Sequence, residues 1–257
     1  MEDVIHWVGG TLIQWACSVA VCLPFVVVAI RSTRLRGQDV RLCAFIQLAI
    51  FFLISLALTR LDPVLSIIRS PWQAMILEAV WALVFIFGTR SVSRAGLTMR
   101  ISKPAWRDSM AVTGLMLLFV VGRRLAVEFL GVGQGGTTSI GLEYVLYELT
   151  MPGIAEELSY RGVIQPELNA ALSLPPLALG EGRREGVVQW GWVIASLLFW
   201  APHAFQVDPQ MQLSFYWPTL TQQLILGFVL GWIRERTSSV FPSMLTHNLV
   251  NVCRILI

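Results

Sequence analysis

The chain has 257 residues, of which 55% are hydrophobic and only 14% are charged, and its mean hydropathy is +0.66. Soluble globular proteins average about 25% charged residues, so a chain with so few charges needs lipid to cover much of its surface. A disordered chain, a disulfide-linked scaffold and a nucleic-acid-binding module do not fit this composition. We therefore predict an integral membrane protein, in contact with the lipid bilayer and without a nucleic-acid partner.

Eight stretches are apolar and long enough, or nearly so, to cross the hydrocarbon core as helices, which takes roughly 20 residues. In chain order they are residues 7–30, 42–59, 72–89, 109–130, 143–165, 188–206, 214–233 and 239–257. The fourth is interrupted by Arg123 and Arg124, and the second, third and eighth are short. No long polar segment separates these stretches. The prediction is an all-α, multi-pass bundle of about eight transmembrane helices, with residues 1–257 as one membrane domain.

The positions of the basic residues predict how this bundle is oriented. Thirteen of the 19 basic residues lie in the linkers after spans one, three, five and seven, whereas only Arg60 and Arg69 lie in the other linkers. Because positively charged loops stay in the cytoplasm, we expect both termini to face outward. No basic stretch precedes the first span, so we expect a retained helix and not a cleavable signal peptide.

The fifth predicted span carries ionisable residues, which are costly inside a membrane and usually face a cavity or a partner. Glu157 and Arg161 are four residues apart and can pair on one helix face. Glu156 points about 100° away, so it is left to face a cavity, where a carboxylate suits a base. Pro152 and Gly153, just upstream, are expected to kink or open the helix. The alternative is a charge network that only joins helices.

Two of the three histidines also lie inside predicted spans. Phe199 and His203 share one face of the sixth span, and His247 and Asn251 share one face of the eighth. A lone histidine in a membrane helix is usually a packing residue. Two of them, with an asparagine one turn on and a glutamate pair on another helix, favour a functional site.

Taken in chain order, the polar residues of the fifth, sixth and eighth predicted spans resemble three motifs of the CAAX protease and bacteriocin-processing family. This family is best known for its type II CAAX prenyl endopeptidases. The three motifs are Glu156-Glu157-x-x-x-Arg161, Phe199-x-x-x-His203 and His247-x-x-x-Asn251. The resemblance covers about residues 143–257, whereas the four spans in residues 1–142 carry no matching motif. It implies an intramembrane glutamic protease with a four-span catalytic core. Such an enzyme hydrolyses a peptide bond in a membrane-associated protein or peptide, often near its C-terminus.

The resemblance also implies a role for each motif residue. The catalytic residues would be Glu156, His203, His247 and Asn251. The supporting residues would be Glu157, Arg161, Phe199 and Tyr160. Glu156 and His203 would bind and deprotonate a water molecule, and His247 and Asn251 would donate hydrogen bonds to the tetrahedral oxyanion. Tyr160 is expected either to line the site or to pack.

Several alternatives stay open. The resemblance implies no cofactor, but Glu156, His203 and His247 also supply the donor set of a catalytic zinc site, although no HExxH pair preorganises them. Two other functions are a non-proteolytic relative that binds and regulates a membrane partner, and a transporter or proton relay built on the same Glu/His cluster. Without an organelle-retention signal, we expect a prokaryotic plasma membrane, where a prenylated CAAX protein is not the obvious substrate.

The remaining polar residues in the spans have simpler interpretations. Arg124 and Glu128 are four residues apart and can pair. Glu78 and Glu148 are expected to form hydrogen bonds between helices, with cavity lining as the alternative. We expect Arg254 to extend to the headgroups, although it could instead reach the C-terminal carboxylate of a substrate.

Overall fold

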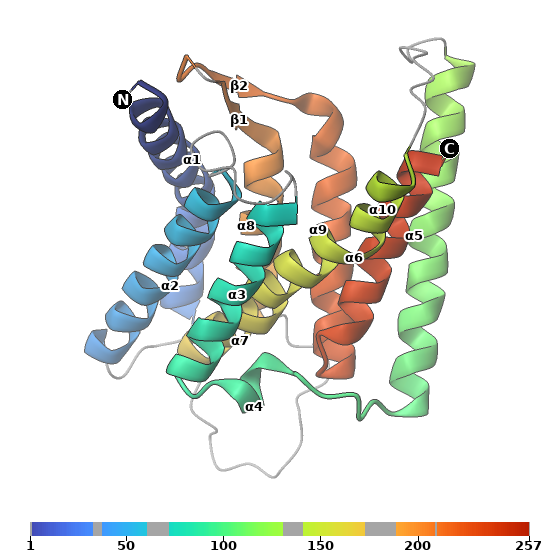
Figure 1. The fold of residues 1–257 in the computed structure, drawn as a ribbon. Helices are drawn as coiled ribbons and strands as arrows, with labels where there is room; N and C mark the ends of the chain where they lie inside the picture. The colour runs from blue at the N-terminus through green and yellow to red at the C-terminus, as the bar shows by residue number, and fades with distance from the viewer. Residues whose placement is uncertain are drawn as a thin grey trace.

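The structure, a computed structural model, describes residues 2–32, 38–60, 72–130, 141–172, 189–208 and 210–256. Its α-helices are α1 (Glu2–Ser32), α2 (Gln38–Thr59), α3 (Trp72–Gly88), α4 (Val92–Ala95), α5 (Lys103–Phe129), α6 (Leu142–Glu157), α7 (Gln165–Leu172), α8 (Trp190–Ala204), α9 (Trp217–Thr237) and α10 (Phe241–Leu256). A π-helical segment, η1 (Leu158–Ile164), joins α6 to α7. Strands β1 (Phe205–Val207) and β2 (Leu213–Phe215) form an antiparallel hairpin between α8 and α9 (Figure 1). The predicted all-α class is confirmed.

Three of the described helices are long and apolar enough to cross a membrane, namely Val4–Arg31, Leu42–Thr59 and Lys103–Phe129. The helix α3 is apolar but shorter, with 17 residues. A described helix overlaps each of the eight predicted spans, and how many of them cross the membrane stays a prediction. Five of the arginines used to predict orientation lie outside the described residues, namely Arg34, Arg36, Arg69, Arg183 and Arg184.

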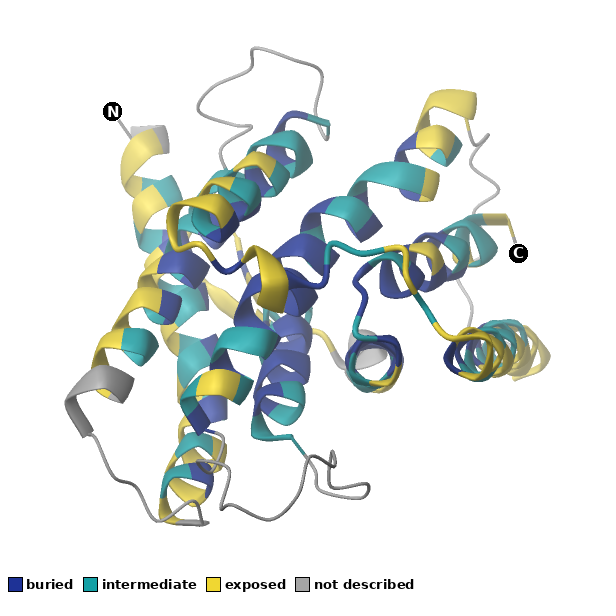
Figure 2. Cartoon of the chain, turned by 90° about the horizontal axis from the view of Figure 1, so that it is seen from below, coloured by how far each residue is buried: buried dark blue, intermediate teal, exposed yellow. Residues whose placement is uncertain are grey.

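Apolar side chains are exposed on the outer faces of the helices, while a few charged ones, among them Glu157 and Arg161, are buried inside. On α5, Leu118 is 68% exposed and Phe129 is 91% exposed. Figure 2 shows that buried positions collect on the inward faces of the helices and exposed positions on the outer faces. Exposed apolar faces of this kind mark a membrane or interaction surface. Together with the candidate spans, they agree with a protein that lipid surrounds.

The two ends of the bundle differ in what they contain. At one end, which we call the α4 end, Val240 N donates to Gly96 O at 3.1 Å and Arg94 pairs with Glu167. These contacts bring α4, α7 and the turn between α9 and α10 together. At the other end, which we call the hairpin end, Arg60 Nη2 donates to Val207 O at 2.8 Å. Figure 1 shows the N-terminus, the C-terminus and the hairpin at the opposite end from α4.

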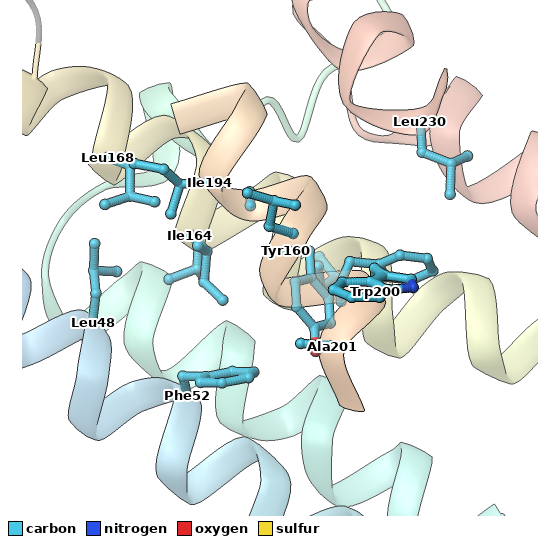
Figure 3. Close-up of a cluster of buried hydrophobic side chains, with 14 of the residues drawn as sticks. Leu48, Phe52, Tyr160, Ile164, Leu168, Ile194, Trp200, Ala201 and Leu230 are labelled. Atoms are coloured by element: carbon cyan, nitrogen blue, oxygen red, sulfur yellow. The ribbon is translucent and has the colours of Figure 1, made fainter. Parts of the chain in front are cut away.

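The helices of the N-terminal half pack directly against the helix that carries the glutamate pair. Figure 3 shows Ile164 and Leu168 beside Leu48 and Phe52 of α2. The Phe52 ring also lies edge-on to Tyr160, with 6.2 Å between their centroids. All five side chains are buried. The motif-free half of the chain therefore forms one side of the core around the motifs.

The two arginines inside α5 are accommodated by polar partners. Arg123 Nη1 donates to Gln222 Oε1 of α9 at 2.9 Å, which joins the two helices. The predicted pair between Arg124 and Glu128 is confirmed, with 2.8 Å between Nε and Oε1. The helix begins at Lys103, six residues before the predicted span, because Ser102 Oγ caps it by accepting from a backbone N–H of its first turn.

The predicted opening of the helix at Pro152 was wrong, because α6 continues through Pro152 and the irregular segment η1 begins only after Glu157. The reason lies on α10, where the Asn248 side chain supports the backbone on both sides of the proline. Asn248 Oδ1 accepts from Gly153 N at 2.9 Å, and its Nδ2 donates to Thr150 O at 3.3 Å. Polar groups that a proline frees can thus be satisfied without breaking the helix.

We predict that Gly153→Ala lowers the free energy of unfolding by about 1–3 kcal/mol, because the close approach of α6 to α10 leaves no room for a methyl group. A Cβ at this position would lie 2.8 Å from the backbone oxygen of Met244 and against the Asn248 amide. Denaturant unfolding of the purified protein in detergent measures the change. Gly122→Ala is the control, because a Cβ there meets nothing within 4 Å. Equal stability of the two variants would contradict the prediction.

Candidate active site

Glu157 and Arg161 form a buried ion pair where α6 passes into η1. Both side chains are 0% exposed, and Arg161 Nη1 donates to Glu157 Oε1 at 3.0 Å. The same Oε1 atom lies 3.0 Å from Nδ1 of His247 on α10. Because a carboxylate only accepts, the Nδ1 hydrogen of His247 completes this contact. The predicted pairing of Glu157 with Arg161 is confirmed, and it fixes His247 beside the glutamate pair.

Arg161 also contacts α8 and α9. Its Nη2 donates to Gly227 O at 2.9 Å, and the same carbonyl accepts from Ser196 Oγ at 2.9 Å. Its Cζ lies 4.5 Å from the centroid of the Phe199 ring, within the range of a cation–π attraction. One buried guanidinium thus links the first motif to α8 and α9, while Glu157 links it to α10.

Glu156 points to a different side from Glu157, as the spacing predicted. Its side chain is 14% exposed, and its Oε2 lies 4.0 Å from Nε2 of His247. Among the described residues, this oxygen has no hydrogen-bond partner. Glu156 therefore presents an acceptor oxygen next to His247, while Glu157 is occupied by the ion pair.

His203 lies near the end of α8, one turn after Phe199. Its Nδ1 is 2.8 Å from the Phe199 carbonyl oxygen, which only accepts, so Nδ1 carries the hydrogen. In the neutral ring, Nε2 is then the acceptor nitrogen. The Phe199 ring lies between the two histidines, with its centroid 5.1 Å from that of His203 and 5.6 Å from that of His247. Phe199 thus helps to position both rings.

Glu156 and His203 line the same cavity, which has a volume of about 400 Å³. Its other walls come from α1, α2, α3 and β1 as well as η1 and α8. Tyr160 lines this cavity and also packs edge-on against Phe199, with 5.3 Å between centroids, so both of its predicted roles are met. The arrangement places a carboxylate and an imidazole on the wall of one cavity that has room for water molecules.

The comparison with protein families agrees with this geometry. Residues 139–253 match the family model described as Type II CAAX prenyl endopeptidase Rce1-like. These residues form an Rce1-like domain. The predicted family resemblance is confirmed, and the family consists of CAAX proteases that are integral membrane hydrolases. Comparison with curated proteins gives no match, and neither does comparison with solved structures.

Within the Rce1-like domain, the third motif lies beside the cavity. His247 and Asn251 are one turn apart on α10, and both are buried. Neither is among the described residues that line the cavity. His247 approaches Glu156 from the side of the ion pair, and Asn251 follows it toward the C-terminal end of α10. The first two motifs therefore contribute directly to the cavity wall, and the third lies next to them.

Sequence reasoning missed Gln14, which connects the N-terminal half to the second motif. Its Nε2 donates to Pro202 O and to Phe205 O, each at 2.9 Å. These two carbonyls flank His203, so Gln14 holds the end of α8 beside the cavity. A polar residue inside the first apolar span is the signal that could have identified it. Glu78 also lines the cavity, which the sequence had offered only as an alternative.

That Arg254 extends to the headgroups stays a prediction, and the structure adds a contact with α6. Its Nη2 lies 3.8 Å from Oε1 of the buried Glu148 on α6, while the Arg254 side chain remains 41% exposed. The contact joins α10 to α6 as an ion pair, and at 3.8 Å it is longer than the interhelical hydrogen bond that was expected of Glu148.

The zinc alternative requires three donor atoms at about 2 Å from one ion. Among the described residues, no group of three or more histidine, cysteine, aspartate or glutamate side chains is arranged to hold a metal ion. Glu156 and His247 approach each other, but the three side chains do not converge as such a group. The alternative therefore needs a side-chain rearrangement.

We predict that Arg161→Ala lowers the free energy of unfolding by about 3–5 kcal/mol, because it leaves the buried Glu157 carboxylate without its cation. Denaturant unfolding in detergent measures the effect. The matched control is Arg124→Ala, which breaks an ion pair with the same four-residue spacing on an exposed helix face. Its effect should stay below about 1 kcal/mol. The prediction fails if the two substitutions have similar effects.

Proposed function

We propose that this protein is an intramembrane endopeptidase in which Glu156 and His203 activate a water molecule that hydrolyses a peptide bond. The proposed substrate is a membrane-associated protein or peptide, cut near its C-terminus. The observation that carries the proposal is that Glu156 and His203 line one cavity, with His247 4.0 Å from the Glu156 carboxylate. The Rce1-like domain supports the reaction class, because its family consists of CAAX proteases.

The two cavity residues have the acceptors that water activation requires. Glu156 Oε2 has no hydrogen-bond partner within the described structure. His203 has its acceptor at Nε2 because Nδ1 donates to the Phe199 carbonyl. A water held between these groups loses a proton to one of them as its oxygen attacks the peptide carbonyl carbon. The same proton then passes to the leaving amine when the C–N bond breaks.

The third motif supplies donors for the oxyanion that forms in this step. His247 already donates from Nδ1 to Glu157, so a donor at Nε2 requires a second proton on the ring. Asn251 provides an amide donor one turn further along α10. Removing one such donor typically lowers kcat by about 100- to 1000-fold. The ion pair of the first motif thereby contributes to the chemistry through His247.

We predict that Glu156→Gln and His203→Ala each lower the rate of cleavage by about 100- to 10,000-fold, because each removes an acceptor for the proton of the water. Mass spectrometry of membrane proteins from cells that make each variant measures the accumulation of uncut C-terminal tails. Glu128→Gln is the control, because this glutamate lies in an exposed ion pair on α5.

Normal processing in both variants would exclude the protease and leave the regulatory and transport alternatives. A transporter would then show pH-dependent uptake in liposomes without a cleavage product. Loss of activity with a chelator and recovery with added zinc would replace the glutamic mechanism with the metal one.

The orientation of the bundle decides which side of the membrane holds the substrate. The α4 end contains Arg90, Arg94 and Arg100, and we propose that it faces the cytoplasm of a prokaryotic cell. The hairpin end, with both termini, then faces outward. Since Gln206 and Val207 of the hairpin line the cavity, substrate tails reach it from the outer side of the membrane.

We predict that a cysteine at Ser214 on β2 reacts with an impermeant maleimide in intact cells, whereas a cysteine at Ser93 on α4 reacts only after permeabilisation. Both serines are exposed and differ from cysteine by one atom. The background protein has its four natural cysteines replaced by serine. The reverse labelling pattern would mean that the α4 end faces outward and that the orientation is wrong.

A further inference from the structure

The cavity that contains the catalytic residues also has a cation on its wall. Among the described residues that line it, Arg60 is the only arginine or lysine. It follows the last residue of α2 and lies at the hairpin end, whereas Glu156 belongs to the last turn of α6. The proposed mechanism uses Glu156 and His203 and gives Arg60 no role.

Arg60 is held by neutral acceptors alone. Its Nη1 donates to Gly10 O at 3.3 Å and to Gln14 Oε1 at 3.0 Å, and its Nη2 donates to Val207 O at 2.8 Å. No carboxylate of the described residues lies within ion-pair distance of it. A guanidinium has five N–H donors, so Nε and one position of Nη2 still have hydrogens to donate. Burial lowers the pKa of the Arg60 guanidinium, because a cation that is partly removed from water and has no counter-ion is less stable.

The surroundings of Arg60 are shaped to hold its guanidinium in one place. A Cβ at Gly10 would lie 2.9 Å from Arg60 Nη2, so α1 approaches it closely only because residue 10 is a glycine. Gln14 accepts from Arg60 and donates to the carbonyls of Pro202 and Phe205. Two successive hydrogen bonds therefore link Arg60 to the backbone on either side of the catalytic histidine, whose ring lines the same cavity.

We infer that Arg60 is a specificity-determining residue that binds the C-terminal carboxylate of the substrate while the scissile bond lies at Glu156 and His203. The inference rests on the proposed function. A planar guanidinium without a counter-ion matches a carboxylate, which it can bind through two parallel N–H donors. Arg60, Glu156 and His203 line one cavity of about 400 Å³, and an extended chain covers about 3.3 Å per residue, so this cavity has room for only a few residues after the scissile bond.

The charges on the cavity wall also orient a bound peptide. Glu78 and Glu156 carry carboxyl groups on the same wall, and neither forms an ion pair with Arg60 in the described structure. A terminal carboxylate is therefore attracted to the hairpin end and repelled from the Glu156 carboxylate. A phosphate group of a lipid could satisfy the same guanidinium, and the experiment below separates the two sources of anion.

The test uses a peptide with the sequence of a tail that accumulates uncut in the Glu156→Gln strain, made as the free acid and as the C-terminal amide. Wild-type protein in liposomes of a neutral lipid should cleave the acid with a kcat/KM about 10- to 100-fold above that of the amide. Arg60→Gln should lose this preference, mainly through a higher KM for the acid, so that acid and amide are cleaved at similar rates. Arg60→Lys keeps the charge but not the planar donor pair, so its preference should be intermediate.

Arg124→Gln is the control, because this exposed arginine lies away from the cavity. This variant should keep the full preference for the acid over the amide. An equal loss for acid and amide in Arg60→Gln would overturn the inference and assign Arg60 a structural role. Equal cleavage of acid and amide by the wild type would also overturn it, and a dependence of both on added anionic lipid would assign the site to a lipid phosphate. A different result would contradict the proposed protease function, namely that no uncut tail accumulates in the Glu156→Gln strain.

Discussion

The ion pair between Glu157 and Arg161 lies where four elements meet, and it places Glu157 against His247 and Arg161 against Phe199. Burying two charges costs several kcal/mol per ion unless further hydrogen bonds satisfy them. Here Arg161 also bonds to Gly227 O and Glu157 also contacts His247. Even so, Arg161 Nε and Glu157 Oε2 have no partner among the described residues. A network that is only partly satisfied contributes little to stability by itself, and its effect is to fix α8, α9 and α10 around the glutamate helix.

The π-helical segment η1 carries the arginine that holds Glu157 in the ion pair. It begins immediately after Glu157 and contains Arg161, and such segments are rare and frequent at functional sites. Its backbone is tied to the α4 end, because Arg234 Nε donates to Arg161 O at 3.1 Å and its Nη2 donates to Arg94 O at 2.6 Å. With the middle of the segment held in this way, Arg161 stays in place to pair with Glu157.

Local spacing allowed prediction of the parts of the site that lie on single helices. The separation of Glu156 from Glu157 follows from helical geometry, and the cost of charge in a membrane marks both residues as functional. The continuity of α6 through Pro152 could not be predicted in this way, because it depends on Asn248 nearly a hundred residues later. The role of Gln14 has the same origin, since its partners Pro202 and Phe205 are 188 and 191 residues away along the chain. Motif spacing carries no information on such contacts.

The residues around the cavity come from both halves of the chain, but only the second half carries recognisable motifs. The match to the Rce1-like family begins at residue 139, and it contains the residues proposed for the chemistry. The wall opposite them comes from α1, α2 and α3, where no motif was found, and it includes Gln14, Arg60 and Glu78. Peptide hydrolysis demands a fixed set of groups, whereas the wall only has to fit what is bound. Under the proposed function, substrate choice then falls to the half of the chain that sequence motifs do not describe.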